Sequence, residues 1–309
     1  MGECDSGGRF SVKFYVARIS FLPSVQKRLV KHEIDMPPID LLAKLLVDNV
    51  EYVPKNKNYG IDLLFGNFIL SEPDNQLLAF KLGRSRAIEV SKYDYDYNKK
   101  EFLEISDTTQ PNVLVLWDSD QQVILVERNT SVFPNYETVF KSIEYHFNNL
   151  VGSYELIVSV IPLTEEMEFW KFINMYRDIY RINFQLIAPN FFGNTQKSVK
   201  DILDAVKEEY NAPELSTQIA NPMGGIKVSD SDTKIISLLN WIKEGGGRWL
   251  IDVMGKRGKK VTIKSNQNAK LVESSIDIEN YTAEEAIAIL ELVKKEYRIS
   301  DDQRSKHDE

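Results

Sequence analysis

The sequence has little cysteine and little histidine, and both scarcities exclude classes of site. Among 309 residues there is one Cys, Cys4, and there are three His, namely His32, His146 and His307, which lie far apart. A single Cys builds neither a disulfide framework nor a cysteine-based zinc site. We therefore expect a reducing, cytoplasmic compartment and no metal site.

Long apolar runs are also missing. The longest ones, such as Val113–Trp117 and Val123–Val126, reach only the length of a strand, and the first ten residues hold no apolar signal-peptide core. This pattern predicts no membrane insertion and no secretion by this route. The content of 43% hydrophobic and 27% charged residues is typical of folded globular proteins and argues against disorder.

The familiar catalytic motifs are absent as well. The segment Gly255–Lys259 lacks the spacing and the Ser or Thr of a phosphate-binding P-loop, and no dinucleotide-binding glycine motif, zinc-hydrolase motif or nucleophile elbow occurs. Asp230 and Asp232 stand at a predicted helix start, where carboxylates stabilise the helix N-terminus. We expect no catalytic residue, no cofactor and a non-enzymatic protein.

Two alternative functions stay open. One is a metal-dependent nuclease with scattered carboxylates, for which Asp118, Asp120 and Glu127 on one hairpin are the candidates. The other is a protein-interaction subunit without DNA affinity, in which the alternating Tyr and Asp residues of Tyr93–Tyr97 form a docking surface. That same segment is also typical of an exposed strand edge or loop, where charge discourages pairing.

The order of predicted elements indicates an α+β fold, with an antiparallel β-rich N-terminal module followed by a mixed α/β module. Short apolar runs separated by turn residues fill the first part, and helices alternate irregularly with strands in the second. The predicted divisions are a flexible leader at 1–9, a β-rich domain at 10–133, an α+β domain at 134–299 and a polar tail at 300–309.

Several elements follow from local patterns. A strand is expected over Phe10–Leu22, a buried helix over Ile39–Val47, and a hairpin over Val113–Trp117 and Val123–Val126. Thr282 and Glu285 form a capping box that opens the last helix. Near the C-terminus, three runs predict a three-stranded meander: Trp249–Val253, Lys260–Lys264 and Ala269–Ile276.

Basic residues are concentrated near the C-terminal end of an acidic chain. The whole sequence has a formal net charge of -8, yet the window from Trp241 to Lys270 holds eight basic and two acidic residues, a local net charge of +6. Such a cluster can contact a phosphate backbone without reading bases, although a solvated loop that aids solubility explains it equally well. The candidate contacts are Arg248, Lys256, Arg257, Lys259, Lys260 and Lys264.

A second basic feature follows a predicted strand. Arg84 and Arg86 flank Ser85, and two guanidinium groups in this arrangement can clamp a phosphate or carboxylate. A simple surface turn is the alternative reading.

These features together resemble the RexA family of phage-exclusion proteins. The resemblance covers mainly residues 10–150 and is carried by the following pieces: Phe14–Ala17, the Leu-rich first helix, Phe80–Lys81, Gly83–Ala87, the hairpin at 113–126 and Phe133–Pro134. It implies a homodimeric, non-enzymatic protein that binds double-stranded DNA, senses infection and signals to an effector protein from the same locus. Arg84 and Arg86 are the residues that the resemblance assigns to DNA.

Overall fold

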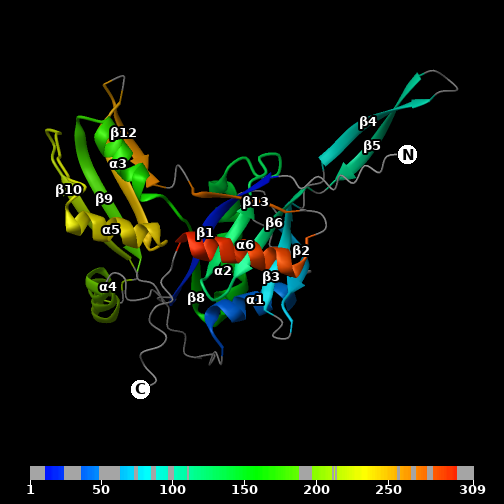
Figure 1. Cartoon of the computed structure of the whole chain (residues 1–309), viewed down its shortest axis with the longest axis horizontal. Helices are drawn as coiled ribbons and strands as arrows, with labels where there is room; N and C mark the ends of the chain where they lie inside the picture. Colours follow the sequence, from blue (N-terminus) through cyan, green and yellow to red (C-terminus); the bar gives the residue numbers. More distant parts are fainter. Residues whose placement is uncertain are drawn as a thin grey trace.

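The computed structural model shows two sheet-based bodies and a projecting hairpin (Figure 1). The structure describes residues 11–23, 36–48, 63–72, 76–84, 88–96, 101–109, 111–187, 197–210, 212, 214–255, 258–265, 269–276 and 281–297. The predicted leader at 1–9 and tail at 300–309 lie outside these residues.

The first body is a seven-stranded antiparallel sheet. Six strands follow the order β13-β1-β7-β6-β3-β2, and β8 also pairs with β1. The strands are β1 (Ser11–Pro23), β2 (Leu63–Leu70), β3 (Leu77–Arg84), β6 (Asn112–Asp118), β7 (Val123–Glu127), β8 (Leu156–Pro162) and β13 (Leu271–Ser275).

Helices cover both faces of this sheet (Figure 1). Helices α1 (Pro38–Asp48) and α2 (Tyr136–Val151) share one hydrophobic cluster with Val113, Val115 and Trp117 of β6. Helix α6 (Ala283–Tyr297) packs on the other face, where Leu114 and Leu116 point. Because β6 is buried on both sides, its sequence is an unbroken apolar run rather than an alternating one.

Strand β1 organises the first body because it pairs along both of its edges. Its residues Phe14–Arg18 pair with β7 on one edge. On the other edge, β13 pairs with Ser11–Tyr15 and β8 pairs with Ala17–Pro23. Backbone hydrogen bonds from Leu163 N to Val16 O and from Lys270 N to Leu163 O, both 2.9 Å, join the three segments where β8 and β13 meet.

The second body is a four-stranded antiparallel sheet with the order β10-β9-β11-β12. Its strands are β9 (Ile179–Ile187), β10 (Glu214–Ala220), β11 (Gly247–Met254) and β12 (Lys260–Lys264). Helices α3 (Glu166–Met175), α4 (Lys197–Tyr210) and α5 (Thr233–Lys243) share its hydrophobic cluster. In β9, Ile182, Phe184 and Leu186 point into that cluster, so all three helices lie on one face. None of the described helices of this body covers the other face, which we call the open face.

Strands β4 (Ile88–Asp96) and β5 (Glu101–Thr109) pair with each other in a separate two-stranded sheet. Figure 1 shows this hairpin extending away from both bodies. It contains Tyr93–Asp96 of the predicted docking segment, whereas Tyr97 lies outside the described residues.

The α+β fold with antiparallel sheets confirms the predicted class. The expected strand at 10–22, helix at 39–47 and hairpin at 113–126 correspond to β1, α1 and β6–β7. The capping box is also confirmed, because Thr282 N donates to Glu285 Oε2 at 3.2 Å and Glu285 N donates to Thr282 Oγ1 at 3.3 Å.

The predicted C-terminal meander is wrong in its last strand. β11 pairs with β12 as expected, but β13 leaves that sheet and pairs with β1 of the first body. The chain therefore returns to the first sheet, and α6 packs there too. The boundary predicted at residues 133–134 falls just before α2, whose residues pack in the same cluster as β1 and β6. The second sheet with its helices spans residues 166–264, inserted between β8 and β13.

Candidate nucleic-acid interface

The basic window predicted from the sequence forms strands β11 and β12 of the second sheet. Lys264 pairs with Leu250, Thr262 with Asp252, and Lys260 with Met254. Because side chains alternate along a strand, Arg248, Lys260 and Lys264 all lie on the open face, opposite the helices. All three are exposed. We call Arg248, Lys260 and Lys264 the basic strip.

Asp252, the acidic residue of β11 on this face, is neutralised by its neighbours. Asp252 Oδ2 forms an ion pair with Arg181 Nε at 2.7 Å, and Asp252 Oδ1 accepts a hydrogen bond from Thr262 Oγ1 at 2.7 Å. Arg181 comes from β9, where it pairs with Asp252 across the sheet. The carboxylate is thus occupied within the sheet and does not cancel the charge of the basic strip.

Two members of the basic strip have partners in β9. The ammonium group of Lys260 lies 4.1 Å from the centre of the Tyr180 ring, a cation–π contact. Arg248 Nε donates to Gln185 Oε1. Next to these residues, Ser216 Oγ of β10 donates to Asn183 Oδ1 at 2.8 Å. The open face is therefore polar across several strands, with fixed hydrogen-bonding groups beside the cations.

The residues that β9 contributes to the open face were not predicted from the sequence. Its residues Arg181, Asn183 and Gln185 alternate with the buried Ile182, Phe184 and Leu186. That period of two was visible as a signal of a strand with one polar face. Nothing local showed that it would pair with β11, which lies more than sixty residues later.

The other predicted contacts have different outcomes. Lys259 is exposed just before β12, and its carbonyl accepts from Gly255 N at 2.9 Å. Lys256 and Arg257 lie outside the described residues. Arg86 is also outside them.

Arg84 lies in the other body, at the end of β3. Its Nη1 donates to Val132 O at 3.0 Å, and its guanidinium lies 6.0 Å from the centre of the Phe133 ring. The Arg84 side chain thus holds the segment between β7 and α2 against the first sheet. The structure does not bring Arg84 together with the basic strip.

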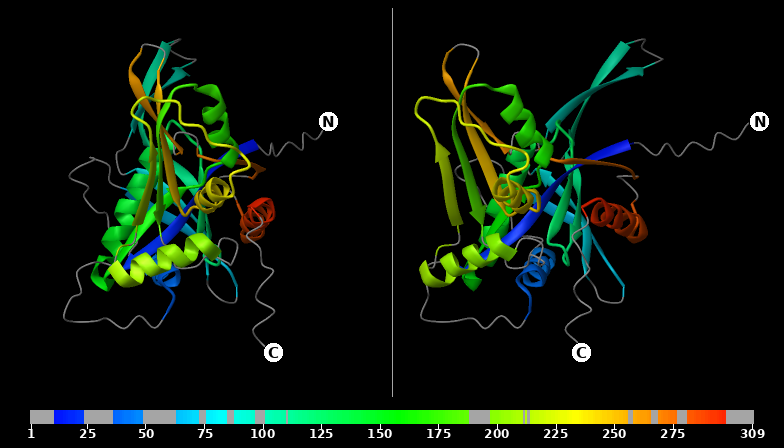
Figure 2. Two further views of the ribbon diagram at one scale, coloured as in Figure 1. Left: turned by 90° about the vertical axis from the view of Figure 1, so that its left-hand side faces the viewer. Right: turned by 60° about the vertical axis from the view of Figure 1, so that its left-hand side comes forward.

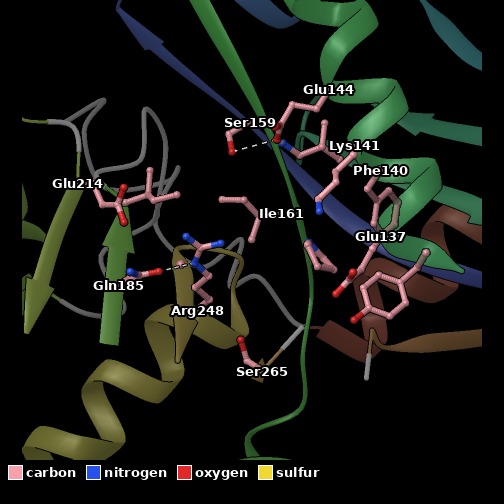
Figure 3. Close-up of a pocket in the computed structure, with 15 residues that line it drawn as sticks. Glu137, Phe140, Lys141, Glu144, Ser159, Ile161, Gln185, Glu214, Arg248 and Ser265 are labelled. Atoms are coloured by element: carbon pink, nitrogen blue, oxygen red, sulfur yellow. Dashed lines mark hydrogen bonds between the residues drawn. The ribbon is translucent and has the colours of Figure 1, made fainter. Parts of the chain in front are cut away.

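A pocket of about 320 Å³ lies where the open face meets α2 and β8 (Figure 3). Arg248, Gln185 and Glu214 line it from the second body, and Lys141 and Glu144 line it from the first. In Figure 3 Arg248 lies close to Ile161 of β8, between Gln185 and the first body. The basic strip therefore continues into a cleft between the two bodies.

Glu144 is a largely buried carboxyl group at this pocket. Its Oε2 accepts from Val160 N at 2.8 Å and from Ser159 Oγ at 3.4 Å. Burial raises the pKa of Glu144, while these hydrogen bonds and the positive charges of Lys141 and Arg248 act in the opposite direction. Glu144 is thus an electrostatic partner of Arg248 from the other body.

Two of the three carboxylates of the nuclease alternative, Asp118 and Glu127, accept backbone hydrogen bonds within the fold. Asp118 Oδ1 accepts from Gln121 N at 2.9 Å, and Glu127 Oε2 accepts from Leu114 N at 2.9 Å. Asp120 is exposed in the turn between them. Over the part of the chain that the structure describes, no group of three or more His, Cys, Asp or Glu side chains is arranged to hold a metal ion.

The predicted role of Asp232 is confirmed, since it is the N-cap of α5 and its side chain accepts from Lys234 N at 2.9 Å.

Within the described residues, no helix is long and apolar enough to cross a membrane.

Comparisons of the chain with protein-family models, with curated proteins and with solved structures found no match. The resemblance to phage-exclusion proteins therefore stays a prediction from the sequence.

Proposed function

We propose that this protein binds duplex DNA through its phosphate backbone and is a non-enzymatic, cytoplasmic sensor or adaptor of anti-phage defence. The observation that carries the proposal is the basic strip. Arg248, Lys260 and Lys264 come from two adjacent strands, are exposed on one open sheet face, and lie beside a carboxylate that Arg181 already neutralises.

The geometry supports backbone binding rather than base readout. The face carries long cationic side chains on a sheet, and the overall charge of the chain is -8. An acidic protein with one basic face is repelled from DNA everywhere else, so binding is restricted to that face and weakens steeply with salt. Phosphate contacts of this kind position a protein without selecting a sequence.

The sensor or adaptor role rests on the two-body arrangement and on the resemblance described above. The basic strip belongs to the second body, and the pocket at its end is shared with α2 and β8 of the first. When a DNA phosphate binds Arg248, it offsets the positive charge that Arg248 presents to Glu144. DNA binding is thereby linked to the contact between the two bodies. An effector protein from the same locus is the proposed recipient of the signal.

A mobility-shift titration of the full chain with duplex DNA at several salt concentrations tests the binding. We expect a shift at low salt that is lost when Lys260 and Lys264 are both changed to Glu. The matched control is Lys171→Glu with Lys234→Glu, because these exposed lysines lie on α3 and α5, on the helix-covered side of the same sheet. The control changes the net charge of the protein by the same amount as the Lys260 and Lys264 variant does. It should bind DNA more tightly than that variant.

Two results would overturn the proposal. Absence of any shift at low salt would leave the interaction-subunit alternative in its place. Cleavage of plasmid DNA in the presence of Mg²⁺ or Mn²⁺, abolished by Asp120→Ala, would instead establish the nuclease alternative.

A further inference from the structure

Strand β10 forms an exposed edge of the second sheet. Except for the half-buried Leu215, every residue of Glu214–Ala220 is exposed, and among the described strands β10 pairs only with β9. After Glu214 the strand carries six consecutive uncharged residues, Leu215–Ala220. Its outer backbone N–H and C=O groups form a template for another strand.

The edge strands β12 and β2 each carry a feature that discourages pairing, and β10 lacks both. At the opposite edge of the same sheet, β12 carries Lys260 and Lys264. At the edge of the first sheet, β2 is interrupted by register shifts between Gly66 and Leu70, and Asn67 has a φ of 50°. Charges and bulges are the usual devices that stop edges from pairing, and β10 has neither in its central part.

The sequence of β10 is complementary to itself in an antiparallel register. When Thr217 lies opposite Thr217 of a second copy, Leu215 faces Ile219 and Ser216 faces Gln218. Each pair then joins residues of similar polarity on one face of the sheet, which is the arrangement that stabilises cross-strand pairs. Ile219 is 39% exposed in the single chain, and this register covers it with Leu215 of the second copy.

Exposed apolar residues at the two ends of β10 fit the same register. Met223, just after the strand, is 89% exposed, and Tyr210, just before it, is 73% exposed. Antiparallel pairing brings the end of one strand beside the start of the other, so these exposed residues of both copies lie near the ends of the paired strands. We infer that two copies of this chain pair through β10, centred on Thr217, and form one continuous eight-stranded antiparallel sheet.

This arrangement has a consequence that rests on the proposed DNA binding. A two-fold axis through Thr217 runs perpendicular to the sheet, so both open faces point to the same side. The two β12 strands are then separated by seven inter-strand spacings, or about 34 Å. One turn of B-form DNA spans about 34 Å, so the two basic strips lie in register with successive turns of one duplex.

Disulfide trapping tests the register directly. In a Cys4→Ser background the chain has no other cysteine, so Thr217→Cys introduces the only thiol. Directly opposed Cα atoms in an antiparallel pair lie about 4.5–5.5 Å apart, within disulfide range. Mild oxidation should yield a covalent dimer of twice 35.6 kDa. Ala220→Cys is the matched control, because its own copies are about 20 Å apart in this register and should not cross-link.

A charge at the two-fold axis tests the interface without oxidation. Thr217→Lys places like charges directly opposite each other, and we expect the mass measured by light scattering to fall to that of the monomer. Asn174→Lys, an exposed position on α3, is the control and should stay dimeric. Circular dichroism of each variant verifies that it is folded.

A monomeric mass of the unmodified full chain at every concentration would overturn the inference. Equal cross-linking of Thr217→Cys and Ala220→Cys would overturn the register. These experiments contain no DNA, so their failure leaves the DNA proposal intact. A dimer that gives no shift with duplex DNA would reject the DNA proposal and leave the dimer.

Discussion

The ammonium group of Lys294 lies 3.4 Å from Oδ2 of Asp118, which joins helix α6 to the tip of the β6–β7 hairpin. Asp118 is buried, and burial raises the pKa of its carboxyl group while Lys294 and the Gln121 N–H hold it down. This pair connects helix α6 to β6 in the first sheet.

Removal of Lys294 should therefore destabilise the protein through Asp118. Lys294→Met leaves the buried Asp118 carboxylate without its ion-pair partner, and we expect a loss of about 2 kcal/mol in the free energy of unfolding, measured by urea denaturation at pH 7. The double variant with Asp118→Asn keeps an acceptor for Gln121 N and removes the charge. It should be more stable than Lys294→Met alone, and equal or lower stability would show that the pair is not the cause.

Gly245 brings the two bodies together at the end of α5. Its φ is +86°, and a Cβ atom there would lie 2.8 Å from Arg18 Cβ and 2.9 Å from Leu163 Cδ2, both in the first body. Arg18 is itself buried, and burial lowers its pKa to about 10 although Glu244 and Asp118 favour its charge. The close approach places the positive charge of Arg18 between carboxylates of both bodies.

Gly245→Ala should cost more than an equivalent change elsewhere. Gly225 has a similar φ of +77°, but a Cβ atom there meets nothing within 4 Å. Gly225→Ala therefore measures backbone strain alone, about 1 kcal/mol, whereas Gly245→Ala adds overlap with Arg18 and Leu163 and should cost about 3 kcal/mol. Thermal and urea denaturation compare the two, and equal losses would mean that the bodies separate easily at this point.

His146 should make the fold sensitive to mild acid. It is 2% exposed, its ring stacks on Phe65 with 4.1 Å between ring centres, and burial lowers its pKa to about 4. The unfolded chain binds a proton near pH 6.5, whereas the folded chain does not. Stability from this group is therefore lost as the pH falls from about 6.5 to about 4, by up to ~3 kcal/mol.

The difference between variants isolates the imidazole of His146 from the carboxylates. His146→Phe retains an aromatic ring beside Phe65 and should flatten the dependence of unfolding free energy on pH between 7 and 4.5. Because the chain has only three histidines, the matched control is His32→Gln with His307→Gln, which should keep the original slope. Loss of the slope in the control would assign the effect to those positions instead.

The sequence predicted elements well where the local pattern determines them. The apolar run Val113–Trp117 is buried on both faces, and the capping pair of Thr282 and Glu285 forms as expected. The partner with which a strand pairs, by contrast, does not follow from the local pattern. Leu271–Ser275 has the pattern of a strand, but its pairing with β1 depends on an edge of β1 that β8 leaves unoccupied. No local pattern encodes that edge.

The candidate site was predictable to the same degree. The basic strip is dense along the sequence, so its charge could be read directly from residues 241–270. Tyr180 and Arg181, which support it, come from β9 and reach it only through strand pairing. The pocket between the bodies, and the structural role of Arg84, likewise arise from packing between segments far apart in the chain.

The basic strip and Arg84 should respond differently when DNA affinity is measured at several salt concentrations. Lys264 is exposed on the open face, so Lys264→Gln should reduce the slope of log affinity against log salt by about 0.9 for one lost phosphate contact. Arg84 donates to Val132 O and lies beside Phe133. Arg84→Gln should leave the slope unchanged and instead lower the unfolding free energy by about 1 kcal/mol. Lys171→Gln, on the helix-covered side, is the control for both measurements. An equal decrease in slope for Arg84→Gln would mean that DNA also contacts the first body near β3, so that the interface extends beyond the second sheet.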